Sequence, residues 1–180
     1  MLSPIQKEIV EESGNLIVRA SAGTGKTHTM VSKIAYDIEQ HHTHKVVAAI
    51  TFTIKAANEI KERLKIDTVN HFIGTNNSFA IEEIIKPFMK DVFGMEYKLD
   101  MSTDYSAKVN TFAEGLAKIK DEQILCSYEN SKENFIFQLA LDILKKSKAC
   151  QLYLQAKYFK IYVDEYQDCD KDMQDRKSVV

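Results

Sequence analysis

The stretch Ala20–Thr27 reads ASAGTGKT, and it decides how the rest of the chain is interpreted. It follows a short apolar run, Leu16–Arg19 (LIVR), which we expect to be a buried strand, and it precedes a helical pattern over Thr27–Gln40. A glycine-containing turn between a strand and a helix points backbone N–H groups and the positive end of the helix dipole at an anion. The sequence therefore predicts a P-loop that holds the phosphates of a nucleotide.

Each residue type in this loop supplies part of the predicted phosphate site. Gly23 and Gly25 let the backbone come close to the phosphates and adopt conformations that a side chain disfavours. Lys26 is expected to place its positive charge on the β- and γ-phosphates, and the Thr27 hydroxyl is expected to ligate Mg²⁺. We therefore predict ATP and Mg²⁺ as the cofactors, with Lys26 as a catalytic residue.

A second motif lies far along the chain, where Ile161–Asp168 reads IYVDEYQD. An apolar strand that ends in two carboxylates is what the opposite side of a P-loop site requires. Asp164 is predicted to hold Mg²⁺, and Glu165 to orient and deprotonate the attacking water. Alone, this motif is read better as a strand end with solvated acids, but together with GTGKT it favours the catalytic interpretation. Adjacent carboxylates near phosphates imply a divalent ion between them.

Apolar runs and helical patterns alternate in the remainder of the predicted core. Val46–Phe52 (VVAAITF) is expected to be a second buried strand, Lys55–Leu64 a helix, and Phe159–Val163 (FKIYV) a late strand. This alternation is typical of an α/β fold with a parallel sheet flanked by helices.

The middle of the chain has a different pattern, which contains helical periods and no expected strand. The helices are predicted at Ile81–Phe93, Val109–Lys120 and Asn134–Lys146. We interpret residues 73–157 as an inserted helical subdomain, and residues 1–72 with 158–180 as an incomplete nucleotide-binding core. This middle stretch contains no arginine, which disfavours a small P-loop kinase with an arginine-rich lid.

Composition excludes some classes of protein. The formal net charge of the 180-residue chain is −2, so any contact with nucleic acid must be local. No apolar run is long enough to span a membrane, and the N-terminus lacks the layout of a signal peptide. The three cysteines form no CxxC pair, which favours reduced thiols and a cytoplasmic location.

With these motifs in place, the chain resembles the N-terminal part of a UvrD/Rep-type superfamily 1 DNA helicase. Four blocks match that family in order: LSPIQKEIV (Leu2–Val10), ASAGTGKT (Ala20–Thr27), ITFTIKAANEIKERL (Ile50–Leu64) and VDEYQD (Val163–Asp168). The third block, which is similar to the family pattern TFTNKAAxEMxxRL, is the most particular to this group. The resemblance implies a first RecA-like ATP-binding domain.

The resemblance also assigns residues to the nucleotide and to single-stranded DNA. It implies that Gln6 reads adenine, and His28 stands where the family often has arginine. The residues predicted to bind the nucleotide are then Gln6, Ala22, Gly23, Thr24, Gly25, Lys26, Thr27 and His28. By the same resemblance, Phe52 lines a pocket for a base, while Thr53 and Lys55 contact DNA phosphates. The alternative for Phe52 is a side chain in the sheet core, and Arg63 is interpreted as a solvated or salt-bridged helix residue.

A fifth block, Asp67–Phe72 (DTVNHF), is similar to a family pattern near TxHSF. The usual histidine position holds Asn70, with His71 one residue later, so Thr68 and His71 are the predicted phosphate neighbours there.

The family continues beyond the DExx motif into a second RecA-like domain that carries arginine fingers, whereas this sequence stops at Val180. We therefore expect the chain alone to bind nucleotide weakly, to hydrolyse ATP very slowly and not to unwind DNA. The alternative is a non-catalytic remnant that binds nucleotide or DNA. The oligomeric state is left open.

Overall fold

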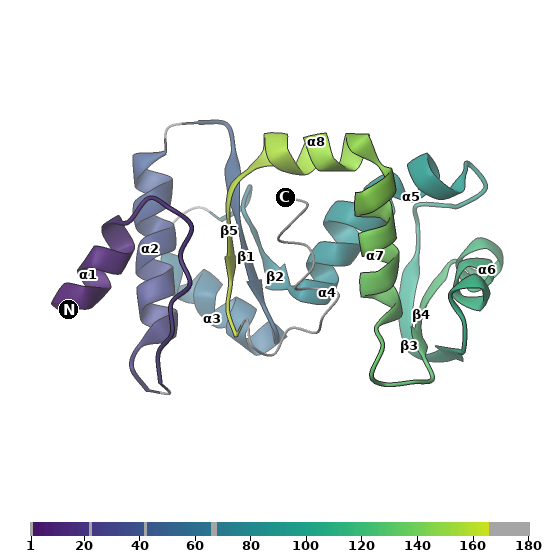
Figure 1. The fold of residues 1–180 in the computed structure, drawn as a ribbon, viewed down its shortest axis with the longest axis horizontal. Coiled ribbons are helices and arrows are strands. Elements are labelled where there is room, and N and C mark those ends of the chain that lie inside the picture. The colour runs from purple at the N-terminus through teal and green to yellow at the C-terminus, as the bar shows by residue number, and fades with distance from the viewer. Residues whose placement is uncertain (1, 22, 42, 66–67, 166–180) are drawn as a thin grey trace. The chain divides into compact units, whose positions relative to one another are not determined.

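A computed structural model describes residues 2–21, 23–41, 43–65 and 68–165 of the chain. The described residues divide into two compact units (Figure 1). The first unit contains residues 2–75 and 157–165, and the second contains residues 76–156.

The first unit is built on a three-stranded parallel sheet with strand order β2-β1-β5. The central strand β1 (Val46–Thr51) pairs with β2 (Phe72–Thr75) on one side and with β5 (Tyr158–Val163) on the other. Ala48 of β1 is opposite Phe72 in one ladder and Ile161 in the other. The strand that follows the predicted P-loop therefore lies beside the strand that ends in the acidic motif, although about 110 residues separate them in the sequence.

Helices α2 (Lys26–Gln40) and α3 (Ile54–Leu64) pack on this sheet, and α1 (Pro4–Glu11) packs on α2 (Figure 1). Their apolar stripes and alternate residues of the strands form one core. Its buried members are Val31, Ile34, Val47, Ala49, Ala57, Ile60, Leu64, Ile73 and Tyr162. A helix stripe packed on a sheet face is what the periodicity of both elements predicts.

Local capping determines where these helices begin. Ser3 accepts a hydrogen bond from the backbone of Gln6, whose side chain accepts one from Ser3, so that a capping box starts α1. Thr53 is the N-cap of α3, and its hydroxyl oxygen accepts a hydrogen bond from the backbone N–H of Ala56 at 3.1 Å. Lys65 then ends α3 in the left-handed conformation, at φ 49°.

The predicted strand at Leu16–Arg19 is wrong. These residues are outside both sheets, and Leu16, Ile17 and Val18 are 43%, 72% and 46% exposed. A short apolar run becomes a strand only where another strand offers it a ladder of hydrogen bonds, and none of the described strands pairs with this run.

The second unit consists of helices and a two-stranded parallel sheet. Its elements are α4 (Asn76–Phe79), the π-helical segment η1 (Ala80–Ile85), α5 (Lys86–Phe93), β3 (Ser102–Val109), α6 (Phe112–Glu122), β4 (Ile124–Tyr128), α7 (Phe135–Lys146) and α8 (Lys148–Lys157). Strands β3 and β4 pair, and α6 connects them. Phe135 is 1% exposed, and the centroid of its ring lies 5.7 Å from the ring centroid of Phe112 and 5.6 Å from that of Tyr128.

The expectation that this middle stretch contains no strand is therefore corrected by β3 and β4. Strand β3 is mostly polar and exposed, so that it carries no alternating apolar pattern, and β4 is an apolar run of only five residues. The predicted helix at Val109–Lys120 begins later, at Phe112, because Val109 ends β3 and Thr111 caps the helix. The assignment of residues 73–157 to an insertion stays a prediction, although Ile73–Thr75 lie in β2 of the first unit.

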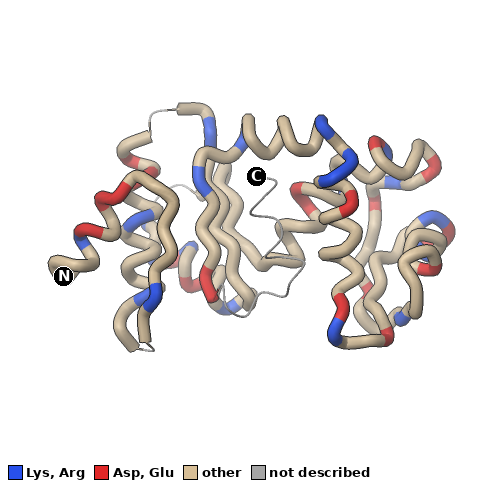
Figure 2. Tube along the Cα trace, in the orientation of Figure 1, with Lys and Arg blue, Asp and Glu red and all other residues tan. Residues whose placement is uncertain are grey.

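Together these elements confirm the predicted class, an α/β fold of the RecA-like kind with a parallel sheet flanked by helices. Basic and acidic residues are interspersed along the helices of each unit (Figure 2). Within the described part of the chain, the helices are all too short or too polar to cross a membrane.

Candidate nucleotide site

The predicted P-loop has the backbone conformation that its glycines allow. Gly23 and Gly25 have positive φ angles of 79° and 85°, which strain any residue with a side chain. A Cβ atom on Gly23 would meet nothing within 4 Å, so the loop surface is open at that point. The Thr24 hydroxyl donates to the carbonyl oxygen of Ser21 at 2.7 Å, which closes the turn, and Gly25 is the N-cap of α2. Lys26 and Thr27 thus form the first turn of this helix, where its dipole favours an anion.

Gln6 reaches this loop from helix α1. Its side-chain Nε2 donates to the carbonyl oxygen of Thr24 at 3.3 Å, and a Cβ atom on Gly25 would lie 3.2 Å from the same nitrogen. The glutamine predicted to read adenine is therefore in direct contact with the phosphate loop. His28 is exposed on the first turns of α2, and its backbone oxygen accepts from Ser32.

The two acids lie at the carboxyl end of β5. The backbone N–H of Asp164 donates to the carbonyl oxygen of Ile50 at 2.9 Å, which extends the β1–β5 ladder by one bond. The carboxylate of Asp164 accepts the backbone N–H of Glu165 at 3.1 Å. Glu165 adopts a left-handed conformation at φ 51°, which turns the chain away from the strand direction. Ligands of parallel α/β sheets bind at this edge, beyond the carboxyl ends of the strands.

One contact joins the two predicted motifs. The Nζ atom of Lys26 lies 3.4 Å from Oε1 of Glu165, and both side chains remain about one third exposed. The two residues are 139 positions apart in the sequence. The contact brings the predicted P-loop and the acidic motif to the same end of the sheet.

The carboxyl group of Asp164 has a raised pKa. Burial raises its pKa above the ordinary value of 3.8, and the neighbouring charge of Glu165 raises it further. The backbone N–H of Glu165 and the charge of Lys26 act in the opposite direction without cancelling this effect. A carboxyl that is costly to ionise gains most from a nearby cation.

The residues present fit the implied magnesium and nucleotide. Hydroxyl and carboxylate oxygens are the ligands that Mg²⁺ prefers, and it usually takes few of them from protein because phosphates and water complete its shell. Thr27 and Asp164 would supply one oxygen donor of each kind. Among the described residues no group of three or more His, Cys, Asp or Glu side chains could hold a metal, so a cage made of protein alone is absent from that part of the chain.

The residues predicted to contact DNA follow β1 and precede β2. Phe52 comes directly after β1 and is 57% exposed, so the alternative that it belongs to the sheet core is wrong. Lys55 is exposed on the first turn of α3, and the hydroxyl oxygen of Thr53 caps that helix. Arg63 forms an ion pair with Glu59 at 2.6 Å, which confirms its interpretation as a salt-bridged helix residue.

Thr68 and His71 lie before β2, at the opposite end of the parallel strands from Phe52. The carbonyl oxygen of Thr68 accepts the backbone N–H of His71 at 3.0 Å. Nδ1 of His71 accepts the backbone N–H of Val47 at 3.2 Å, so this ring holds the start of β1. The structure thus does not bring these two residues together with Phe52 and Lys55. Ala22, and residues 166–168 of the acidic motif, lie outside the described residues.

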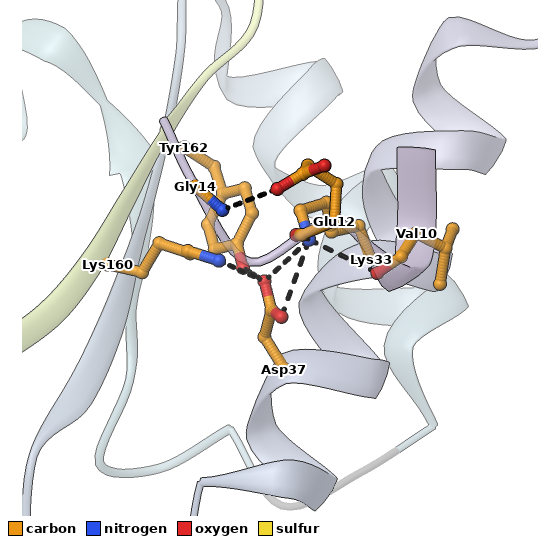
Figure 3. A network of polar contacts seen from close by, with 7 residues as sticks. All are labelled: Val10, Glu12, Gly14, Lys33, Asp37, Lys160 and Tyr162. Carbon is orange, nitrogen blue, oxygen red and sulfur yellow. Dashed lines mark hydrogen bonds and ion pairs between the residues drawn. The ribbon is translucent and has the colours of Figure 1, made fainter. Parts of the chain in front are cut away.

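Sequence reasoning missed a polar network that joins the end of α1 to α2 and β5 (Figure 3). It contains Lys33 and Asp37 of α2 with Lys160 and Tyr162 of β5. The side chains of Lys33 and Asp37 are 7% and 11% exposed. A lysine and an aspartate four positions apart on a predicted helix, and a lysine inside an apolar strand, were the available signals.

A glycine-containing loop that opens a helix, facing two carboxylates at the end of a neighbouring parallel strand, defines the site of a P-loop nucleotide-binding protein. The family model for the UvrD/REP helicase N-terminal domain matches residues 2–134. The chain belongs to this family.

Curated relatives agree with this placement. The Gabija protein GajB of Bacillus cereus (strain VD045) is 48% identical over 169 residues, which are 93% of this chain and 34% of that protein. The ATP-dependent DNA helicase PcrA of Bacillus subtilis (strain 168) is 28% identical over 94% of this chain and 30% of its own length. The ATP-dependent DNA helicase Rep of Escherichia coli (strain K12) is 32% identical over 69% of this chain and 19% of its own length. The chain therefore spans about a third or less of these relatives.

Proposed function

We propose that this chain is the ATP-binding part of a UvrD-like helicase or translocase that uses ATP hydrolysis to move along single-stranded DNA. The observation that carries the proposal is the 3.4 Å contact of Lys26 with Glu165, which brings the P-loop and the acidic motif into one site. Family membership and similarity to the ATP-dependent DNA helicases PcrA and Rep support the same assignment.

The proposed chemistry assigns one task to each group. Bound Mg²⁺, held by Thr27 and Asp164, would neutralise charge on the phosphate oxygens. The backbone N–H groups of Gly23, Thr24 and Gly25 would cradle the phosphates, with Lys26 releasing Glu165 to contact them. Glu165 would then be available to orient a water molecule and take its proton. Gln6 would bind adenine beside the loop. The proposed nucleotide set also includes Ala22 and His28.

We propose that Phe52 stacks on a base of single-stranded DNA, with Thr53 and Lys55 near the backbone. An exposed aromatic ring beside a lysine is suited to sequence-tolerant binding, because every base offers a flat face for stacking. Thr68 and His71 lie at the other end of the strands from Phe52, so the proposal does not require them to contact the same nucleotides as Phe52. These two residues are proposed as separate phosphate neighbours.

This chain covers only about a third of the length of GajB and PcrA, so a helicase activity would belong to a longer protein. We propose that a second RecA-like domain supplies arginine fingers and the other wall of the cleft, as expected for UvrD/Rep-type helicases. The 180-residue chain alone is then expected to bind ATP weakly, to hydrolyse it slowly and not to unwind DNA. The relatives are longer than this chain, which covers 34% of GajB and 30% of PcrA, and this supports a longer parent protein. A cytoplasmic location is proposed with it.

The test is ATP hydrolysis by a protein that joins this chain to a second RecA-like domain, with and without single-stranded DNA. We expect DNA to stimulate hydrolysis and Lys26→Ala to reduce it by about a hundredfold or more. Lys120→Ala is the matched control, because Lys120 is half exposed in a long ion pair with Glu96 at 3.8 Å. A rate that neither DNA nor Lys26→Ala changes would overturn the proposal and favour the non-catalytic alternative.

A further inference from the structure

Helix α1 carries Gln6, yet it is too short to be stable alone. It has eight residues, and isolated helices shorter than about 12 residues are marginal in water. No basic residue lies in its last turn, so its terminal carbonyl groups need a partner from elsewhere. Lys33 of α2 is that partner, since its Nζ donates to the carbonyl oxygens of Val10 at 3.1 Å and Glu12 at 2.5 Å.

Asp37 holds Lys33 in this position. Nζ of Lys33 also lies 3.4 Å from Oδ1 of Asp37, so all three ammonium protons have an acceptor (Figure 3). Oδ2 of Asp37 accepts from Lys160 at 2.9 Å and from the hydroxyl of Tyr162. Lys33, Asp37 and Tyr162 are buried and Lys160 is partly buried, and each charged group has a partner. Under this condition a polar network fixes geometry instead of weakening a core.

The network thereby ties together the three elements that form the nucleotide site. Lys33 and Asp37 belong to the helix that begins at the P-loop, and Lys160 and Tyr162 belong to the strand that ends directly before Asp164. The carbonyl oxygens belong to the end of α1, one turn after Gln6. Gln6 in turn contacts Thr24 of the P-loop.

We infer that the Lys33–Asp37–Tyr162 network is a positioning device that sets the distance of Gln6 from the P-loop, and so sets the preference of the site for adenine. This inference rests on the proposed function, because it assumes that the P-loop takes ATP and that Gln6 meets the base. Lys33, Asp37 and Tyr162 act through Gln6 and are positioning residues rather than catalytic ones. A purely structural network would stabilise the unit without affecting which base is bound.

The experiment compares the full 180-residue chain with Lys33→Met, which keeps an unbranched side chain one atom shorter and removes the ammonium group. Binding of fluorescent ATP and GTP analogues is measured by titration. We expect Lys33→Met to lower ATP affinity by up to about tenfold, as for the loss of the one hydrogen bond between Gln6 and adenine, and to leave GTP affinity nearly unchanged. Gln6→Ala should reduce the ATP-over-GTP ratio equally, and the double variant should reduce it no further. Tyr162→Phe should give a smaller loss in the same direction.

Two controls match the chemistry of these changes outside the network. Lys118→Met removes a lysine that pairs with Glu122 four positions later on an exposed helix face, at 2.9 Å. Tyr153→Phe removes a hydroxyl that donates to Glu83 at 3.0 Å in the second unit. Neither change should alter the ratio. A ratio that Lys33→Met leaves at the wild-type value, while urea unfolding shows lost stability, would overturn the inference.

A second readout needs no nucleotide. Amide hydrogen exchange of the free protein should become about tenfold faster in α1 after Lys33→Met, with Thr24 and Gly25 affected through Gln6, and unchanged in α7. If the wild-type chain binds neither nucleotide, the exchange data alone decide whether Lys33 positions α1, and the proposed function is decided separately by ATP hydrolysis of the protein that includes a second RecA-like domain. Exchange in α1 that Lys33→Met leaves unchanged would contradict the positioning role on its own.

Discussion

The exposed ring of Phe52, directly after β1, is proposed to bind single-stranded DNA and does not belong to the sheet core. Because Phe52 is 57% exposed, we expect Phe52→Ala to change the free energy of unfolding by no more than about 0.5 kcal/mol. The same change should weaken binding of single-stranded DNA by about 1–3 kcal/mol, the cost of one lost stacking contact. Fluorescence anisotropy with a labelled oligonucleotide, on the protein that includes a second RecA-like domain, measures the DNA effect.

Ile60→Ala gives the comparison that this measurement needs. Ile60 is fully buried in the core of the same unit, so its truncation should cost about 2–5 kcal/mol of stability. If Phe52→Ala destabilised the chain to a similar extent, or left DNA binding intact, the proposed stacking role of Phe52 would be rejected.

At the scale of single residues, sequence reasoning predicted two motifs that the structure brings together and missed the polar network beside them. The contact of Lys26 with Glu165 could be expected because phosphate and water chemistry requires those side chains in motifs of fixed spacing. Lys33 and Asp37 could not, because their roles depend on the end of α1 and on β5 arriving at the same place. That meeting is a property of tertiary packing, which the helical pattern of α2 does not contain.

Helix α6 shows how packing can reverse a helix propensity. Alanine normally favours a helix over glycine by about 1 kcal/mol, but a Cβ atom on Gly115 would lie 2.1 Å from the ring of Phe135. Phe135 is buried and in contact with two other rings, so it has little room to move. We expect Gly115→Ala to destabilise the protein by about 1–3 kcal/mol, the cost of overpacking, as measured by urea unfolding followed by circular dichroism.

Ala117→Gly is the matched change on the exposed face of the same helix. It should destabilise by about 1 kcal/mol through propensity alone. The prediction fails if Gly115→Ala stabilises the protein, since propensity would then outweigh the contact with Phe135.

Elements followed the sequence where pattern and capping agreed, and departed from it where a strand needed a neighbour. Strands β1 and β5 and helices α2 and α3 lie within two residues of their predicted bounds, because apolar periodicity and Thr53 mark them. Leu16–Arg19 has the composition of a strand but has no described neighbouring strand to pair with. Strand β3 pairs with β4 but does not have the alternating apolar pattern of a strand. Strand formation depends on pairing as well as on pattern, and pairing is not local.

For the whole molecule, the buried network predicts how stability changes with pH. Burial alone would raise the pKa of Asp37, but hydrogen bonds from Tyr162, Lys160 and Lys33 outweigh it and hold the pKa below the ordinary 3.8. The folded state therefore binds fewer protons than the unfolded state between the two values, so unfolding takes up a proton. The stability that Asp37 contributes is fully present above pH 3.8 and is lost as pH falls through the lower, folded-state pKa.

Asp37→Asn should remove this contribution. At pH 7 the variant leaves Lys33 and Lys160 without a buried counter-charge, and we expect a loss on the order of 3 kcal/mol in the urea-derived free energy of unfolding. Below pH 3.8 the difference between variant and wild type should shrink, because protonated Asp37 no longer pairs with the lysines. Asp142→Asn is the control, since Asp142 pairs with Lys146 at the same spacing on an exposed helix face. It should cost about 0–1 kcal/mol at any pH.

Asp164 makes the comparison between variants necessary, because its effect has the opposite sign. Its pKa is raised by burial and by Glu165, so it favours the folded state at low pH and loses that contribution as pH rises through the folded-state value. The wild-type profile alone mixes the two carboxyls, whereas the difference between wild type and Asp37→Asn isolates one. A difference that stays constant from pH 7 to pH 3 would mean that the ionised carboxylate of Asp37 does not hold α1, α2 and β5 together.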